Sequence, residues 1–139
     1  MTRCAILLLS ATLLLFSTGC NLHGRLYNLG NGEVTPVKFT YSGSGKGTIS
    51  GVFPSGESFS GDYVTFAHPP VNWGKIYGSV YGDFSWGEQH TGSSLQQYGT
   101  AVGSGNRGSV VDCEYVTASL THGSGACLDK NGTRYKMMW

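Results

Sequence analysis

VDCEYVTASLTHGSGACLDKNGTRY, residues 111–135, is the stretch of the chain that decides the fold. Val111, Cys113 and Tyr115 alternate with other residues, as in a β-strand that buries one face. Gly125-Ala126-Cys127-Leu128 alternates in the same way, and Asn131-Gly132 is a dipeptide typical of a tight hairpin turn. The stretch therefore predicts antiparallel strands joined by short turns.

Cys113 and Cys127 lie on these two alternating runs. We expect the runs to be neighbouring strands with a disulfide between them. Closing a loop of about 15 residues in this way stabilises a domain by roughly 3 kcal/mol in the chain-entropy treatment. A metal or redox pair is the alternative, but the spacing is not Cys-x-x-Cys and no histidine lies beside either thiol on its strand face.

The same turn chemistry extends over the rest of the chain. Further hairpin dipeptides occur at Asn31-Gly32, Ser55-Gly56 and Gly105-Asn106, and no window after Cys20 shows helical periodicity without an intervening Gly or Pro. We expect an all-β fold, an antiparallel meander of about 8–10 strands that forms a small barrel or sandwich after an N-terminal signal helix. The predicted strands are 24–28, 33–41, 45–53, 58–66, 74–81, 94–103, 108–117, 119–128 and 133–139.

Glycine is unusually frequent inside these predicted strands. The chain has 22 glycines, far above the typical share of about 7%. Glycines within strands mark bulges, sharp bends or a close approach of another backbone or a ligand. Those within alternating runs are Gly47, Gly51, Gly61, Gly78, Gly99 and Gly125. The predicted core consists of Leu26, Val37, Phe39, Ile49, Phe53, Phe59, Tyr63, Ile76, Val80, Val111, Tyr115, Tyr135 and Met137.

The first twenty residues have the layout of an export signal. A short basic start that includes Arg3 precedes CAILLLSATLLLF, residues 4–16, and Ser17-Thr18-Gly19 then leads to Cys20. An apolar run of about 10–14 residues fits a signal peptide better than a transmembrane helix, which needs about 20. Ser17-Thr18-Gly19 also fits the loose ending of an ordinary cleaved signal, and a retained anchor is a further alternative.

Gly19-Cys20 resembles the lipobox of bacterial lipoproteins, and the chain as a whole resembles small uncharacterised members of that group. Other points of resemblance are Gly24-Arg25-Leu26-Tyr27-Asn28, Gly32-Glu33-Val34 and Gly123-x-Gly125-x-Cys127 followed by Asn131-Gly132-x-x-Tyr135. The resemblance implies a signal peptide over 1–19, a lipidated Cys20 with a short tether over 20–23, and one β-domain over 24–139. It implies a palmitate-bearing protein of the cell envelope whose partner is the membrane. Asn21, in place of Asp, favours the outer membrane.

Charge and motifs argue against several functions. Without Arg3 the chain carries eight Lys and Arg against eight Asp and Glu, so we expect no nucleic-acid partner. His23, His68, His90 and His122 lack metal-ligand spacing. No nucleophile elbow, phosphate loop or recognisable carboxylate pair is present in the sequence. We therefore predict no enzyme activity, no catalytic residue, no cofactor and no metal.

Aromatic residues concentrate between Trp73 and Trp86. Exposed aromatic rings stack on sugars and peptides, and the amide side chains that follow could orient hydroxyl groups. Trp73, Tyr77, Tyr81 and Trp86 are thus candidate contacts for a glycan or an envelope protein. The alternative is that they belong to the core or face a membrane.

The leading functional hypothesis is a lipid-anchored binding or scaffolding module of the envelope. One alternative is an envelope hydrolase or a lysozyme-inhibitor-like defence factor, which requires a converging polar pocket. A second alternative is a small integral outer-membrane β-barrel, because Tyr135-Lys136-Met137-Met138-Trp139 ends the chain with apolar alternation.

Overall fold

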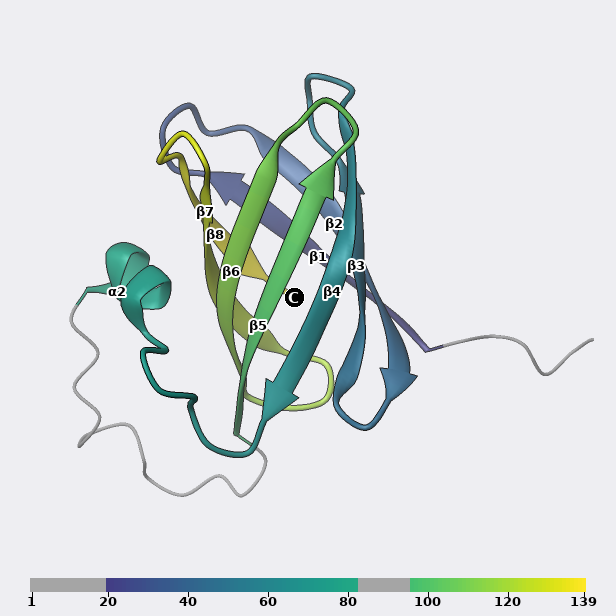
Figure 1. Ribbon diagram of the computed structural model, residues 1–139, viewed down its shortest axis with the longest axis vertical. Coiled ribbons are helices and arrows are strands. Elements are labelled where there is room, and N and C mark those ends of the chain that lie inside the picture. The colour runs from purple at the N-terminus through teal and green to yellow at the C-terminus, as the bar shows by residue number, and fades with distance from the viewer. Residues whose placement is uncertain (1–19, 83–95) are drawn as a thin grey trace, which may run out of the picture.

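Eight antiparallel strands close into a barrel in the computed structural model, which describes residues 20–82 and 96–139 (Figure 1). The strands follow one another around the barrel in chain order, and the last pairs with the first. The fold is the predicted all-β meander, closed as a barrel. The strands are β1 Asn21–Asn28, β2 Val34–Gly43, β3 Lys46–Val52, β4 Ser58–Phe66, β5 Gln97–Gly105, β6 Val110–Thr117, β7 Gly123–Asp129 and β8 Arg134–Met138.

The barrel has two different ends. The turns β1–β2, β3–β4, β5–β6 and β7–β8 meet at one end, which we call the hairpin end, and Cys20, the other turns and Trp139 lie at the opposite one, the Cys20 end. All four predicted hairpins are found at the hairpin end. Gly32, Gly56 and Gly132 there have φ of 78°, 83° and 85°. This left-handed conformation suits glycine because it has no Cβ.

Side chains fill the barrel, so it has a packed core and no open channel. The buried cluster consists of Leu26, Val37, Phe39, Ile49, Phe59, Ala101, Val111, Cys113, Tyr115, Cys127, Tyr135 and Met137. The predicted core residues Phe53 and Tyr63 are half-buried and pack against this cluster. Ile76 and Val80 are only half-buried, because they lie outside the barrel.

Tyr115 shows how the interior is built. It stands opposite Gly99 of β5 and Gly125 of β7 in the strand register. A Cβ on Gly99 would lie only 2.0 Å from the Tyr115 Cζ, and one on Gly125 would lie 2.9 Å from the Tyr115 Cβ. The phenol therefore occupies the space that neighbouring side chains would need. Its hydroxyl donates to the Val64 carbonyl at 3.0 Å, and burial raises the pKa of Tyr115 to about 12.

The same arrangement recurs around the barrel. An inward aromatic ring covers an inward glycine on an adjacent strand, and a Cβ on that glycine would lie within 3 Å of the ring. The pairs are Tyr63 with Gly47, Phe59 with Gly51, and Trp139 with Gly123. Five of the glycines singled out from the sequence, Gly47, Gly51, Gly61, Gly99 and Gly125, thus mark close approaches inside the wall.

The predicted disulfide is confirmed. Cys113 of β6 and Cys127 of β7 are directly opposed in register, with their Cα atoms 4.0 Å apart, and they form a bridge. Both side chains are buried in the barrel core. The bridge joins two strands that the sequence pattern had already paired.

The strand predicted over 74–81 is wrong, because Lys75–Tyr81 forms the helix α2. Trp73, Tyr77 and Tyr81 are spaced four residues apart, which places them on one side of a helix. That side packs on the outer wall of β6 and β7, next to which α2 stands in Figure 1. Packing against the barrel thus outweighs the strand-like composition of this segment. Gly78, which we predicted to lie inside a strand, lies in the helix.

β1 begins earlier than predicted. Asn21, Leu22 and His23 pair with Thr40, Phe39 and Lys38 of β2, so these three residues continue the strand where a tether was expected. Leu22 packs against the core, which explains why the pairing extends this far. Cys20 therefore directly precedes a rigid strand.

The fit between Tyr115 and Gly99 is testable with a matched pair of glycine substitutions. We expect Gly99→Ala to destabilise the protein by about 1–3 kcal/mol, the usual cost of overpacking. Gly78→Ala on α2 is the control, because no atom lies within 4 Å of its added Cβ. It should stabilise the helix by up to about 1 kcal/mol. Urea unfolding measures both, and equal effects would contradict the packing described here.

Candidate functional site

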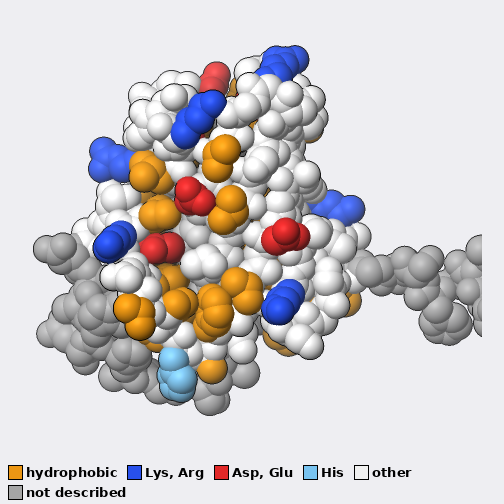
Figure 2. All heavy atoms as spheres, in the orientation of Figure 1, with side chains coloured by type: hydrophobic (Ala, Val, Ile, Leu, Met, Phe, Trp, Pro, Cys, Tyr) orange, Lys and Arg blue, Asp and Glu red, His pale blue; other side chains and the backbone are white. Residues whose placement is uncertain are grey.

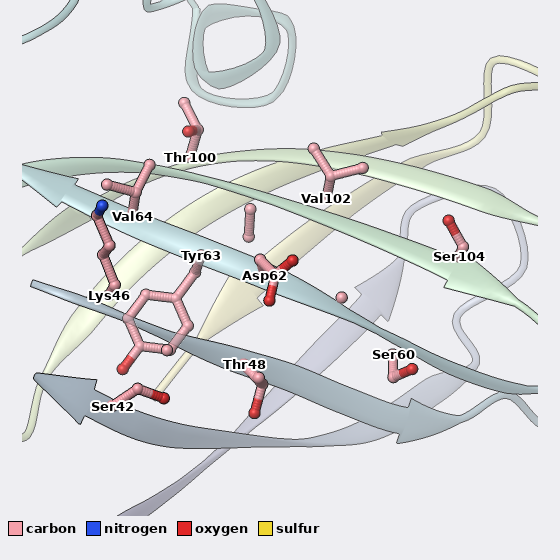
Figure 3. Close-up of a pocket in the computed structure, with 13 residues that line it drawn as sticks. Ser42, Lys46, Thr48, Ser60, Asp62, Tyr63, Val64, Thr100, Val102 and Ser104 are labelled. Carbon is pink, nitrogen blue, oxygen red and sulfur yellow. The ribbon is translucent and has the colours of Figure 1, made fainter.

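A shallow groove of about 740 Å³ crosses the outer wall of the barrel over β3, β4 and β5 (Figure 3). Its lining includes the hydroxyl side chains Ser42, Thr48, Ser60, Thr100 and Ser104, together with Asp62 and Lys46, although most of the surface that the lining exposes is apolar. Val64 and Val102 supply apolar surface, and Gly47, Gly61, Tyr63 and Ala101 complete the lining.

Register places the groove residues in rows across the three strands. Asp62 is central: Figure 3 shows it between Thr48 and Val102, its direct partners on β3 and β5. Side chains directly opposite each other in antiparallel strands have Cβ atoms about 4.5–5.5 Å apart. The flanking rows are Lys46 with Val64 and Thr100, and Ser50 with Ser60 and Ser104.

The inner side of this wall alternates large residues, such as Ile49, Phe59 and Tyr63, with glycines. Gly61 faces Gly103 across β4 and β5, and a Cβ on Gly61 would lie 1.7 Å from the Val102 carbonyl oxygen. Only a glycine permits so close an approach of the two backbones, and the groove lies on the outer face of this part of the wall.

The groove offers a dense set of hydrogen-bonding groups on a rigid support. Asp62 is an exposed acceptor, the hydroxyl groups around it both donate and accept, and Lys46 adds a cationic donor at one edge. Val102 is 48% exposed and provides a flat apolar contact beside Asp62. Burial, together with the neighbouring Tyr41, raises the pKa of Tyr63, so its hydroxyl stays protonated at neutral pH. Such a surface suits a ligand with many hydroxyl or amide groups.

A second, smaller cavity of about 160 Å³ opens at the hairpin end. Glu57 lies there, 7% exposed, and its Oε1 accepts from the backbone N–H groups of Arg107 and Ser109 at 2.9 and 3.0 Å. The Ser109 hydroxyl donates to Glu57 Oε2 at 2.6 Å. This hydroxyl contact is the main reason why the pKa of Glu57 is lowered. Glu57 thus fastens the β3–β4 hairpin to the β5–β6 hairpin.

Asp129 has a similar structural task in the same cavity. Its Oδ1 accepts from the backbone N–H groups of Asn131 and Thr133 at 2.8 and 2.9 Å and so shapes the β7–β8 turn. The pKa of Tyr135 is raised, first by burial and then by the charge of Asp129. The carboxylates of this cavity are therefore engaged in holding turns.

The structure brings three of the four predicted aromatic contacts together. The Trp73 and Tyr77 rings stack with their centroids 5.3 Å apart, and the Tyr77 and Tyr81 rings at 4.4 Å. Trp73 and Tyr77 are buried with Tyr98 and Val116 between α2 and the barrel. Tyr81 is 37% exposed, and Trp86 lies outside the described residues. Ligand contact by these residues stays a prediction.

Glu114 is the residue that holds α2 in place, and sequence reasoning missed it. Its side chain points outward from β6, yet it is only 7% exposed. Its Oε2 accepts from the backbone N–H groups of Gly74, Ile76 and Tyr77 at 2.9, 2.9 and 2.8 Å. These groups at the start of a helix lack partners within it. A carboxylate from a distant strand therefore caps the helix.

Cys20 is exposed and unbridged immediately before β1. In the part of the chain that the structure describes, no group of three or more His, Cys, Asp or Glu is placed to hold a metal ion. Within the same residues, no helix has the length and apolarity needed to span a membrane.

No family model matches the chain, and no curated protein or solved structure is similar enough to count as a match. The fold and the surface chemistry therefore have to support any functional conclusion on their own.

Substitution of Glu114 tests the attachment of α2. We expect Glu114→Ala to lower the free energy of unfolding by about 1.5–3 kcal/mol, the range for hydrogen bonds to a charged group. Asp112→Ala, at an exposed outward position on the same strand, should change it by less than about 0.5 kcal/mol. Urea unfolding gives the energies, and hydrogen exchange at Ile76 and Tyr77 reports the helix. Unchanged protection of these amides in Glu114→Ala would contradict the capping role.

Proposed function

We propose that this protein is a binding module of the bacterial envelope, anchored to the outer membrane through a lipid on Cys20, whose β3–β5 groove binds a glycan. The observation that carries the proposal is the grid of hydroxyl groups around Asp62 on a rigid, concave wall. A polyhydroxylated chain can exchange hydrogen bonds with each row while its apolar ring faces contact Val64 and Val102.

The position of Cys20 is compatible with this anchoring. The residue is exposed and lies at the end of the barrel opposite the four hairpins. The groove is on the side wall and reaches the Cys20 end at Ser42 and Lys46, whereas Thr48, Ser60 and Asp62 lie farther along the wall and are exposed. A lipid on Cys20 would therefore leave the groove accessible.

The outer wall of the barrel fits a water-exposed protein better than an integral membrane barrel, in which lipid would surround this wall. Outward positions on β1, β2, β4 and β6 carry the exposed side chains His23, Arg25, Lys38, Asp62 and Asp112. Charged residues on the lipid-facing side of a membrane barrel cost about 2–4 kcal/mol each for Arg or Lys at mid-depth. A water-exposed barrel avoids this cost.

A binding module also fits the groove better than a hydrolase does. Among the described lining residues Asp62 is the one carboxylate. Glycoside hydrolysis commonly needs two carboxyl groups on either side of the scissile bond. The groove therefore supplies contacts for a glycan but a single carboxylate, where glycoside hydrolysis commonly needs two.

Co-sedimentation with purified peptidoglycan sacculi tests the groove. The protein should sediment with sacculi, and Asp62→Ala should weaken the binding about ten- to a hundredfold, because a hydrogen-bonded charge is worth about 1.5–3 kcal/mol. Asp112→Ala removes the same charge from the neighbouring outward position that does not line the groove. It should bind as the unaltered protein does. Equal loss in both variants, or no binding to begin with, would refute the peptidoglycan version of the proposal.

Metabolic labelling with radioactive palmitate tests the anchor. The protein should incorporate the label and fractionate with membranes, whereas Cys20→Ala should do neither. Cys4→Ala is the matched control, because it removes the one other cysteine of the sequence besides Cys113 and Cys127 and should leave labelling intact. Label retained in Cys20→Ala, or absent from the unaltered protein, would count against lipidation.

A further inference from the structure

The two most exposed apolar side chains of the described residues, Leu120 and Val71, belong to the Cys20 end. Leu120, in the β6–β7 turn, is 94% exposed, and Val71, in the connection that leaves β4, is 92% exposed. Tyr41 is 53% exposed and lies beside Cys20, since its backbone N–H donates to the Cys20 carbonyl at 3.3 Å. Two connections and the end of β2 thus present exposed apolar groups at the end of the barrel that holds Cys20, the proposed attachment point of the lipid.

The described turns of the two ends differ in their acidic side chains. The hairpin end carries Glu33, Glu57 and Asp129, together with the cations Arg107 and Lys130. At the Cys20 end, the segments 41–46, 66–74 and 117–123 contain no Asp or Glu, and Lys46 provides a positive charge. In Figure 2 the lower part of the face shown carries hydrophobic side chains and a histidine, while the acidic side chains lie higher. Among the described residues, these three segments thus present no acidic side chain to the anionic headgroups of a bilayer.

Aromatic residues lie beneath and beside these exposed side chains. Trp139, at the end of β8, is half-buried against Phe39 and Tyr115, with ring centroids 5.4 and 5.6 Å away. Tyr41 adds an exposed ring with a polar tip. Trp and Tyr prefer the layer where the headgroups of a membrane meet its acyl chains. The firm support below them allows the exposed apolar groups to enter that layer without rearrangement of the barrel.

We propose that the Cys20 end is a membrane-contact surface, in which Leu120, Val71 and Tyr41 enter the headgroup layer of the phospholipid bilayer. The inference rests on the proposed anchoring through Cys20, which brings this end to the bilayer. It adds an orientation: the hairpin end faces away from the membrane, and the barrel is held at more than one point. Because β1 starts at Asn21, directly after the proposed lipidation site, an anchor there would leave Leu120, Val71 and Tyr41 little room to stay clear of the surface.

A fluorescent probe on Leu120 tests the contact in the lipidated protein reconstituted into phosphatidylcholine–phosphatidylglycerol vesicles. With Cys20 acylated and Cys113 bridged to Cys127, Leu120→Cys supplies one reactive thiol for an environment-sensitive nitrobenzoxadiazole label. Val34→Cys, 43% exposed near the hairpin end, is the matched control. We expect blue-shifted emission at position 120 and at least several-fold stronger quenching there than at 34 by spin labels attached to the lipids.

The outcomes separate this inference from the anchoring on which it rests. Failure of the unaltered protein to float with the vesicles would reject the anchor and the contact together. Flotation with equally weak quenching at 120 and 34 would reject the contact alone. A blue shift at 120 without quenching by lipid-borne spin labels would show that a second protein copy covers this end, and it would likewise overturn the proposal.

Discussion

The fit of inward aromatic rings over inward glycines is the constraint on which the rest of this structure depends. Tyr115 lies over Gly99 and Gly125, and Tyr63 lies over Gly47, each across a pair of neighbouring strands. A shift of register by one residue would send the rings outward and bring other side chains into their space. The glycines therefore determine which residues of adjacent strands meet, and the disulfide fixes one of these pairings covalently.

The same glycines connect the fold to the candidate site. Inward glycines on β3, β4 and β5 allow close approaches within this wall, and the groove lies on its outer face. Asp62 then lies in a hollow among hydroxyl groups, with Gly61 next to it in the chain at the closest backbone contact. A larger residue at Gly61 would separate β4 from β5 and flatten the groove. Packing inside the barrel thus shapes the surface that we assign to ligand binding.

Sequence reasoning succeeded where the signals are local. Alternation and turn dipeptides predicted all eight strands and all four hairpins of the hairpin end, and the pairing of Cys113 with Cys127. It failed at α2, because that helix depends on Glu114, which is nearly forty residues away in the chain. The groove was also missed: Thr48, Asp62 and Val102 are unremarkable outward residues until the register places them in one row.

The even number of strands has a consequence for orientation. In an antiparallel barrel with an even number of strands, the last strand ends at the same end of the barrel at which the first strand begins. Cys20 and Trp139 therefore share one end, and the four hairpins share the other. Since β1 begins one residue after Cys20, a lipid there is joined to the barrel without a flexible linker. The orientation of the groove would then follow from the barrel geometry itself. Asp62 lies midway along β4 on the side wall, so an anchor at Cys20 would hold it at a distance from the bilayer.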